Sequence, residues 1–263
     1  MLRAITRQVS PTLADCNLTF IGRVEIDIGK AIEQHRAYER TLERLGANVL
    51  SLPAETAYPD GVFVEDPAIV LDQIAVICRP GAASRRGEET SLAEAIASFR
   101  ELRWIREPAT IEGGDIVRIG KVLYAGVSRR TNLEGVRQLG ELTAPFGYRV
   151  VPVEVRGCLH LKSACCPLDN SSLLTRRAWI DAAPFESYRM IDVAEEWAAD
   201  VLPIGETILI PAGFPKTQER LEQSGYRTLS IDVSELQKAE AGVTCMSLIF
   251  DERSLPAGGE QNL

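Results

Sequence analysis

A repeated order of strands, turn and helix runs along this 263-residue chain. Segments that begin at Asp115 and Asp200 read D-I-V-R-I-G-K-V-L-Y-A-G and D-V-L-P-I-G-E-T-I-L-I-P-A-G, each with two short apolar runs around a glycine turn. A polar loop, a helical segment and another apolar run follow, the last at 149–153 and 228–233. The unit is therefore ββαβ, and such a unit buries its faces only against neighbouring copies.

Two further copies follow the same template. The copy that starts at Asp66 has a turn at 72–73 and a helical segment near 90–101. A weaker copy begins near His160, with the strand 172–174 after its turn. Together these four copies account for the middle of the chain.

The two ends of the chain together supply a fifth copy. Its first strand is 244–250 and its second is 5–9, followed by a helix from about 28 to 45 that Gly46 ends and by the strand 48–52. A ring closed in this way has no exposed sheet edge. The sequence therefore predicts an α/β fold, a five-bladed pseudo-symmetric α/β propeller of ββαβ repeats closed by the N- and C-terminal strands. We expect residues 1–263 to form a single domain, with a flexible tail after about residue 252.

The bulk composition narrows the class of protein. A net charge of −8 argues against nucleic acid as a partner. No apolar run approaches the roughly 20 residues that span a membrane, and the first residues lack the apolar core of a secretory signal, so we expect a cytoplasmic location. The six cysteines show no Cys-x-x-Cys or zinc-finger spacing, which predicts no metal or cofactor. A homodimer agrees with base rates, and no motif specifies it.

Charged and reactive residues stand where the first strands of the units begin. They are the pair Glu65 and Asp66, then Glu112, His160 and Cys245. In a radial arrangement these equivalent positions converge on one central cavity. Buried charges are costly without partners, so this set favours a thiol-based active site over an apolar core.

The chain has two histidines, and their surroundings differ. His35 lies in a charged amphipathic helix, and we expect it to be a solvated surface residue. His160 has apolar neighbours on both sides and stands in repeat register with Cys245. We therefore expect Cys245 to be the nucleophile, His160 the general acid and base, and Glu112 the group that orients the imidazole. Asp200 has no catalytic neighbour in sequence, and we expect it to support a turn or loop.

Six motifs, in order along nearly the whole chain, resemble the dimethylarginine dimethylaminohydrolase family of the guanidino-group-modifying superfamily. They are P-D-G-V-F-V-E-D-P at 59–67, S-R-R-G-E at 84–88, I-E-G-G-D at 111–115, R-T-N-L-E-G at 130–135, L-H-L-K at 159–162 and V-T-C-M-S-L at 243–248. The resemblance implies a pseudo-fivefold propeller and a cofactor-free hydrolase. It implies that Cys245 attacks the guanidinium carbon of a methylated arginine, and that a thiouronium intermediate is then hydrolysed to citrulline.

The resemblance also implies roles for the binding residues. The small-molecule substrate would be a methylarginine-like guanidine. Its guanidinium would meet two carboxylates, its carboxylate two arginines and its α-amine an aspartate, while a lid contributes backbone contacts. The corresponding residues are Glu65 and Asp66, Arg85 and Arg130, Asp60, and Leu18 on the lid. The choice of Arg85 over its neighbour Arg86 rests on the resemblance alone.

One position bears on the choice of substrate. The deiminases and amidinotransferases of this superfamily carry His-x-Asp, whereas this chain has His160-Leu161-Lys162. A dimethylated nitrogen has no N–H for that aspartate to bind, so its loss favours methylated arginine. Two alternatives stay open: a deiminase or amidinotransferase acting on arginine or another N-substituted guanidine, and a non-catalytic protein that binds arginine-like metabolites.

Overall fold

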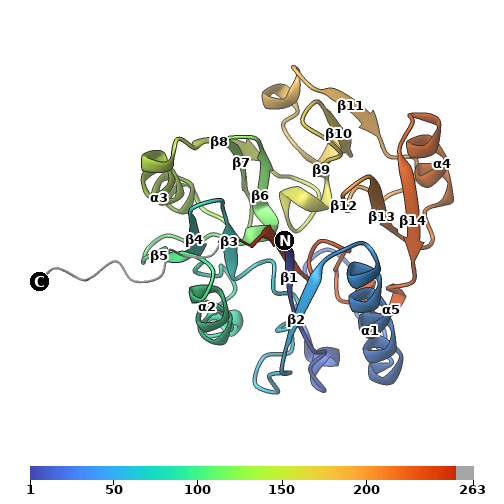
Figure 1. Cartoon of the computed structure of the whole chain (residues 1–263), viewed down its shortest axis with the longest axis horizontal. Helices are drawn as coiled ribbons and strands as arrows, with labels where there is room; N and C mark the ends of the chain where they lie inside the picture. The colour runs from blue at the N-terminus through green and yellow to red at the C-terminus, as the bar shows by residue number, and fades with distance from the viewer. Residues whose placement is uncertain (253–263) are drawn as a thin grey trace, which may run out of the picture.

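A computed structural model describes residues 1–252. Five three-stranded sheets stand around a common centre, with the longer helices at the periphery (Figure 1). In each sheet the inner strand runs antiparallel to the middle strand, and the middle strand runs parallel to the outer one. The predicted five-bladed α/β propeller is confirmed.

The strands follow the predicted register closely. The inner strands are β3 (Ala68–Val70), β6 (Ile116–Ile119), β9 (Cys165–Pro167), β12 (Leu202–Ile204) and β15 (Leu248–Asp251). The middle strands are β4 (Ile74–Ile77), β7 (Val122–Val127), β10 (Ser172–Thr175), β13 (Thr207–Pro211) and β1 (Leu2–Arg7). The outer strands are β5 (Glu101–Trp104), β8 (Arg149–Glu154), β11 (Arg189–Asp192), β14 (Arg227–Ile231) and β2 (Asn48–Leu52).

The ring closes through the two ends of the chain. Strand β15 pairs antiparallel with β1, and β1 pairs parallel with β2. The helix of this unit, α1 (Ile28–Arg44), begins at Asp27, whose carboxylate accepts the N–H of Lys30 at 3.0 Å. It ends before Gly46, which has a φ of +94° that favours glycine. The part of the predicted tail beyond residue 252 lies outside the described residues.

Three other units carry an α-helix, and one does not. The helices are α2 (Glu89–Ala97), α3 (Leu133–Thr143) and α4 (Pro215–Gln223), and a short α5 (Ser234–Gln237) precedes β15. In the unit that starts near His160, two 3-10 helices (Arg177–Trp179 and Ala183–Phe185) replace the α-helix. In this segment the ring of Trp179 packs against the ring of Trp197, with 4.6 Å between the two centroids. None of the helices within residues 1–252 is long and apolar enough to cross a membrane.

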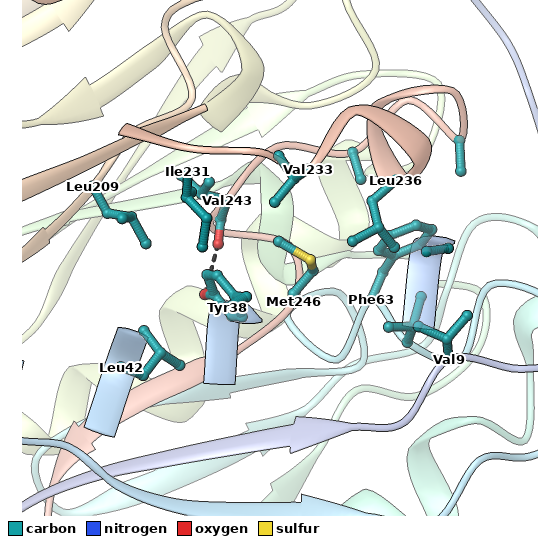
Figure 2. Packing of buried hydrophobic residues seen from close by; sticks show 14 of the residues in the cluster. Val9, Tyr38, Leu42, Phe63, Leu209, Ile231, Val233, Leu236, Val243 and Met246 are labelled. Atoms are coloured by element: carbon teal, nitrogen blue, oxygen red, sulfur yellow. Dashed lines mark hydrogen bonds between the residues drawn. The ribbon is translucent and has the colours of Figure 1, made fainter. Parts of the chain in front are cut away.

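The loop that carries Cys245 rests on a large apolar cluster beside α1 (Figure 2). Tyr38 of α1 is fully buried there, and its phenol donates to the carbonyl of Val243 at 2.7 Å. The same oxygen lies 2.7 Å from the hydroxyl of Ser247. Residues on both sides of the cysteine are therefore fixed to the helix by one side chain.

The expectation for His35 is wrong. Its side chain is 2% exposed, because α1 turns it inward with Tyr38 instead of outward with the charged face. Its Nδ1 lies 3.8 Å from Glu39, which also accepts a hydrogen bond from Thr6 of β1 at 2.7 Å. Burial lowers the pKa of His35. The charged residues next to His35 in sequence suggested an exposed position, but His35 lies among polar residues on the buried face of the helix.

Candidate active site

The predicted catalytic residues lie on loops that enter the inner strands. Glu112 precedes the 3-10 turn Gly113–Asp115 that leads into β6. His160 precedes the turn Leu161–Ser163 before β9, and Cys245 lies shortly before β15. The inner strands surround one centre (Figure 1), and each opens a unit with the same strand order, so we expect their starts to lie at the same end of the ring.

A short hydrogen bond joins His160 to Glu112. The imidazole Nε2 lies 2.7 Å from Glu112 Oε2, and Nδ1 lies 3.7 Å from Asp66 Oδ1. Burial lowers the pKa of His160, but Asp66, Glu112 and Asp115 raise it, with a net value of about 9. Burial raises the pKa of Glu112, but the bond from His160 lowers it to about 2. The pair is therefore an imidazolium and a carboxylate at neutral pH.

Further donors hold the Glu112 carboxylate in place. Its Oε1 accepts the N–H of Gly81 at 3.0 Å and lies 3.5 Å from Arg130 Nη1. Its backbone N–H donates to the hydroxyl of Thr131 at 3.1 Å. Glu112 is wholly buried, so these contacts compensate for the cost of removing its charge from water.

Asp66 connects this pair to the predicted substrate arginine. Asp66 Oδ2 lies 2.5 Å from Arg85 Nη1, and Arg85 also pairs with Glu88 at 2.8 Å. A third bond from Arg85 goes to the carbonyl of Phe63 at 3.1 Å. The Arg85 guanidinium is thus buried and occupied by protein partners, whereas Arg86 is exposed and donates to the carbonyl of Pro80 at 3.3 Å.

Glu65 belongs to a second network next to Cys245. Its Oε1 lies 2.5 Å from Lys162 Nζ, and its Oε2 accepts the hydroxyl of Thr244 at 2.8 Å. Its backbone N–H donates to the carbonyl of Cys245 at 3.1 Å. Lys162 therefore faces a carboxylate.

Cys245 is protonated in this environment. Burial raises the pKa of its thiol well above the ordinary value, and Asp200, Glu65 and Asp66 raise it further. The sulfur accepts the N–H of Gly242 at 3.4 Å. Among the hydrogen bonds of residues 1–252, none joins this sulfur to His160. A cation bound between the two would favour the thiolate, because it offsets the surrounding negative charge.

Three aspartates hold the loops that carry Glu112, His160 and Cys245 in the same way. Asp66 accepts the N–H of Gly114 at 3.1 Å, close to Glu112. Asp115 accepts the N–H of Leu161 at 2.9 Å, next to His160. Asp200 accepts the N–H of Thr244 at 2.9 Å, next to Cys245. In each case an aspartate from the start of one unit supports the strand entry of another, which confirms the expected loop support by Asp200.

Asp60, the predicted α-amine ligand, holds the residue that precedes Leu18, the predicted lid residue. Asp60 is buried and accepts bonds from the N–H and the side-chain amide of Asn17, the latter at 2.7 Å. Leu18 packs at the edge of the apolar cluster that Cys245 also touches. The carboxylate of Glu240 accepts the backbone N–H groups of three consecutive residues, Thr19, Phe20 and Ile21. One side chain thus fastens the segment that follows Leu18.

A cavity of about 450 Å³ runs between the inner strands. Glu65, Lys162 and Thr244 line it where the strands begin.

Asp66, Glu112 and His160 offer ligand atoms within 4.8 Å of one another, a spacing that suits a metal ion. Each of the three already makes a hydrogen bond or ion pair within the protein, and a metal would have to replace those contacts.

The structure brings most predicted residues together and adds several. Glu112 and His160 are in direct contact, and Cys245 bonds to Glu65 through its carbonyl. The residues that the sequence did not assign are Lys162, Tyr38, Thr244 and Glu240. Their polar side chains are held by partners distant in sequence, which no local motif predicts. The equivalent repeat positions of Asp115 and Asp200 were the one feature of the sequence that indicated contacts between loops.

Comparison with known proteins places the chain among enzymes that act on guanidino compounds. A family model described as "N,N dimethylarginine dimethylhydrolase, eukaryotic" matches residues 21–163. The N(G),N(G)-dimethylarginine dimethylaminohydrolase of Pseudomonas aeruginosa is 38% identical over 228 residues, covering 85% of this chain and 90% of that protein. The enzyme of the same name from Streptomyces coelicolor is 39% identical over 252 residues, covering 95% and 97%.

Solved structures agree with this placement. A cysteine-to-serine mutant of the Pseudomonas aeruginosa enzyme, complexed with citrulline, has a TM-score of 0.90 and 36% identity, covering 95% of this chain and 100% of that chain. The N-terminal domain of ArgZ, an arginine dihydrolase, has a TM-score of 0.84 at 22% identity, covering 97% and 99%, and shares the fold.

Proposed function

Because this chain belongs to the dimethylarginine dimethylaminohydrolase family, we propose that it hydrolyses Nω-methylated arginine, with asymmetric dimethylarginine and water giving citrulline and dimethylamine. The observation that carries the proposal is the buried contact of 2.7 Å between His160 and Glu112, which the adjacent residues Asp66 and Glu65 connect to Cys245. His160, Glu112 and Cys245 supply a base, its orienting carboxylate and a nucleophile.

Substrate binding uses the charged groups around this centre. Glu65 and Asp66 bind the guanidinium, because both are buried carboxylates whose charges act on the Cys245 thiol. The substrate carboxylate needs cationic donors at the rim, where planar guanidinium groups offer two parallel N–H bonds. The proposed ligands for the rest of the substrate are Arg85 and Arg130 for the carboxylate, Asp60 for the α-amine and the backbone of Leu18. Arg85 exchanges one of its contacts with Asp66, Glu88 or the carbonyl of Phe63 for the substrate carboxylate.

The first half of the reaction forms a covalent intermediate. Arrival of the cationic guanidinium lowers the pKa of the Cys245 thiol, and its proton passes to solvent. The thiolate sulfur bonds to the guanidinium carbon, and one carbon–nitrogen π pair moves onto nitrogen. His160 gives its proton to the dimethylamine nitrogen, the bond from carbon to that nitrogen breaks, and a thiouronium remains.

The second half uses His160 in the opposite sense. The neutral imidazole takes a proton from water, and the water oxygen bonds to the thiouronium carbon. The sulfur–carbon bond then breaks while the new hydroxyl gives its proton to solvent, which releases neutral citrulline and the Cys245 thiolate. The thiolate takes a proton from solvent once the product has left, and this restores the resting thiol. Glu112 stabilises the imidazolium at both stages, because it is ionised and hydrogen-bonded to Nε2.

The ion pair between Lys162 and Glu65 favours a methylated substrate over free arginine. A deiminase of this superfamily places an aspartate two residues after the histidine, and this chain places there a lysine that neutralises a neighbouring carboxylate. The site therefore has fewer free acceptors for guanidinium N–H groups. That suits a guanidinium with a dimethylated nitrogen, which has fewer N–H groups to donate.

The test is citrulline formation by the purified protein from asymmetric dimethylarginine and from arginine in parallel. We expect turnover of the methylated substrate. Turnover of arginine alone would instead identify a deiminase, and binding of both without turnover would identify a non-catalytic binding protein. A homodimer and a cytoplasmic location stay predictions from the sequence.

A further inference from the structure

Two carboxyl groups meet on one hydroxyl next to the nucleophile. Thr244 Oγ1 lies 2.8 Å from Glu65 Oε2 and 3.0 Å from Asp200 Oδ2, and all three residues are buried. A hydroxyl carries a single hydrogen, so it fully satisfies only one of these oxygens. If both carboxyls were ionised, the hydroxyl could donate to only one of them. At the other contact, the lone pairs of two oxygens would face each other without a hydrogen between them, in a buried place that water does not reach.

The partners of the two carboxyls differ. Glu65 Oε1 lies 2.5 Å from the ammonium of Lys162, which favours the ionised form. Asp200 makes no ion pair within residues 1–252, and its Oδ1 accepts only the neutral N–H of Thr244 at 2.9 Å. The hydrogen that the pair requires therefore belongs on Asp200.

We infer that Asp200 is a neutral carboxylic acid in the resting protein, and that it donates from Oδ2 to Thr244 Oγ1, whose own hydrogen then points at Glu65 Oε2. This inference rests on the proposed function, and it makes Asp200 a positioning residue for that function. It fixes the direction of each hydrogen bond in the chain from Asp200 to Glu65. Glu65 is held by Lys162 on one oxygen and by Thr244 on the other, with its carboxylate set beside Cys245.

The surroundings of Asp200 agree with a neutral group. Burial raises the pKa of its carboxyl, and the negative charge of Glu65 raises it further, to about 7. The other titratable groups that face it are the ammonium of Lys162, the thiols of Cys166 and Cys245, and the phenol of Tyr38. Of these, only Lys162 opposes the shift, and it is paired with Glu65.

A neutral Asp200 has a chemical consequence for the nucleophile. Asp200 is the first of the charged groups that raise the pKa of the Cys245 thiol. Holding a proton on Asp200 therefore keeps one negative charge away from the sulfur. When the pH rises through the pKa of Asp200, that charge appears and makes the thiolate harder to form.

Infrared difference spectroscopy on protein labelled with carboxyl-¹³C aspartate tests the protonation directly. We expect an isotope-shifted carboxylic acid band that fades as the pH rises through about 7 and is absent from Asp200→Asn. Asp115→Asn is the matched control, because Asp115 is a buried carboxyl in the equivalent repeat position with a pKa of about 6. If Asp200→Asn kept every carboxylic acid band of the wild type, the inference would be overturned.

The reactivity of Cys245 gives a second readout. Asparagine keeps both bonds to Thr244 but cannot ionise, so alkylation of Cys245 by iodoacetamide, followed by mass spectrometry, should be about tenfold faster in Asp200→Asn at alkaline pH. Identical alkylation profiles at equal unfolding midpoints would also overturn the inference.

A second variant keeps the inference testable if Asp200→Asn does not fold. In Thr244→Val the Asp200 acid loses its acceptor, and we expect its infrared band to shift, while Thr244→Ser restores it. An unshifted band in Thr244→Val contradicts the proposed chain of bonds. Neither spectroscopy nor alkylation requires turnover, so failure of this inference and failure of the proposed function give different results.

Discussion

His160 Nε2 lies 2.7 Å from Glu112 Oε2, and both side chains are closed off from solvent. The carboxylate therefore holds the imidazole in one orientation and keeps it charged at neutral pH. This charge is what a leaving amine needs from its proton donor.

Replacing Glu112 by glutamine should lower kcat by about 100-fold or more, because general acid catalysis of this kind contributes about that much. The neutral amide no longer stabilises the imidazolium, so the pKa of His160, now about 9, should fall. Citrulline assays and NMR titration of the histidine ring measure the two effects. Glu206→Gln, at the exposed turn after β12, is the control. An unchanged histidine pKa would show that Glu112 does not set the charge.

Stability should decline as the solution becomes alkaline. His160 has a pKa of about 9 in the folded protein and about 6.5 in the unfolded chain, so folding gains from its protonation. That gain is complete below about pH 6.5 and is lost as the pH rises to about 9. The thermal midpoint should therefore fall over this range in the wild type and fall less in His160→Asn. Circular dichroism at matched ionic strength gives both slopes, and equal slopes would contradict the assignment.

Cys245→Ser should remove turnover, by on the order of a thousandfold or more, while the fold is retained. A serine hydroxyl in this acidic surrounding is a much weaker nucleophile than the thiolate. The matched controls are Cys165→Ala and Cys166→Ala, which change buried thiols on β9. If one of these controls lost citrulline formation and Cys245→Ser kept it, the nucleophile would be elsewhere.

Tyr38→Phe should loosen the nucleophile loop. The change removes the bond to the carbonyl of Val243 and leaves that buried acceptor without its phenol donor. We expect a loss of about 1–3 kcal/mol in the free energy of unfolding, together with a lower kcat, because Cys245 lies between the two fastened residues. Denaturant unfolding and initial rates measure both. Tyr226→Phe, which loses a bond to Asp169 at the surface, should cost less stability and leave kcat as it is.

Glu240→Ala should free the lid. Its carboxylate accepts three consecutive backbone N–H groups, so their amides should exchange hydrogen faster in the variant. We expect KM to rise by about tenfold, about 1.4 kcal/mol, because the rim beside Leu18 must be ordered on binding. Hydrogen exchange by mass spectrometry reads the segment directly. Glu25→Gln, exposed on the same loop, should change neither quantity.

Much of the fold could be predicted because each copy of the repeat shows the same order of apolar runs and turns in the sequence. The strand Asn48–Leu52 agrees to the residue, and the ring closure through both termini followed from counting copies. The unit after His160 could not be predicted in full. The repeat predicts an α-helix in its connection, which instead forms two 3-10 helices, with Trp179 packed on Trp197.

The site was predictable where a residue stands at a strand start and less so elsewhere. Glu112, His160 and Cys245 share a repeat position, so the topology alone gathers them. Tyr38 and Glu240 act through contacts more than 200 residues apart in sequence, and no local pattern marks such a pair. His35 was misjudged for a related reason, since the buried face of α1 depends on what packs against it.

The closure of the ring by β1 and β15 also orders events during synthesis. Strand β1 leaves the ribosome early and β15 late, and the loop before β15 carries Cys245. A growing chain therefore presents the proposed acid–base pair of Glu112 and His160 before it presents the proposed nucleophile, Cys245. The proposed reactive centre is complete only when β15 docks beside β1, so a chain that stops short of β15 lacks the proposed nucleophile in its place.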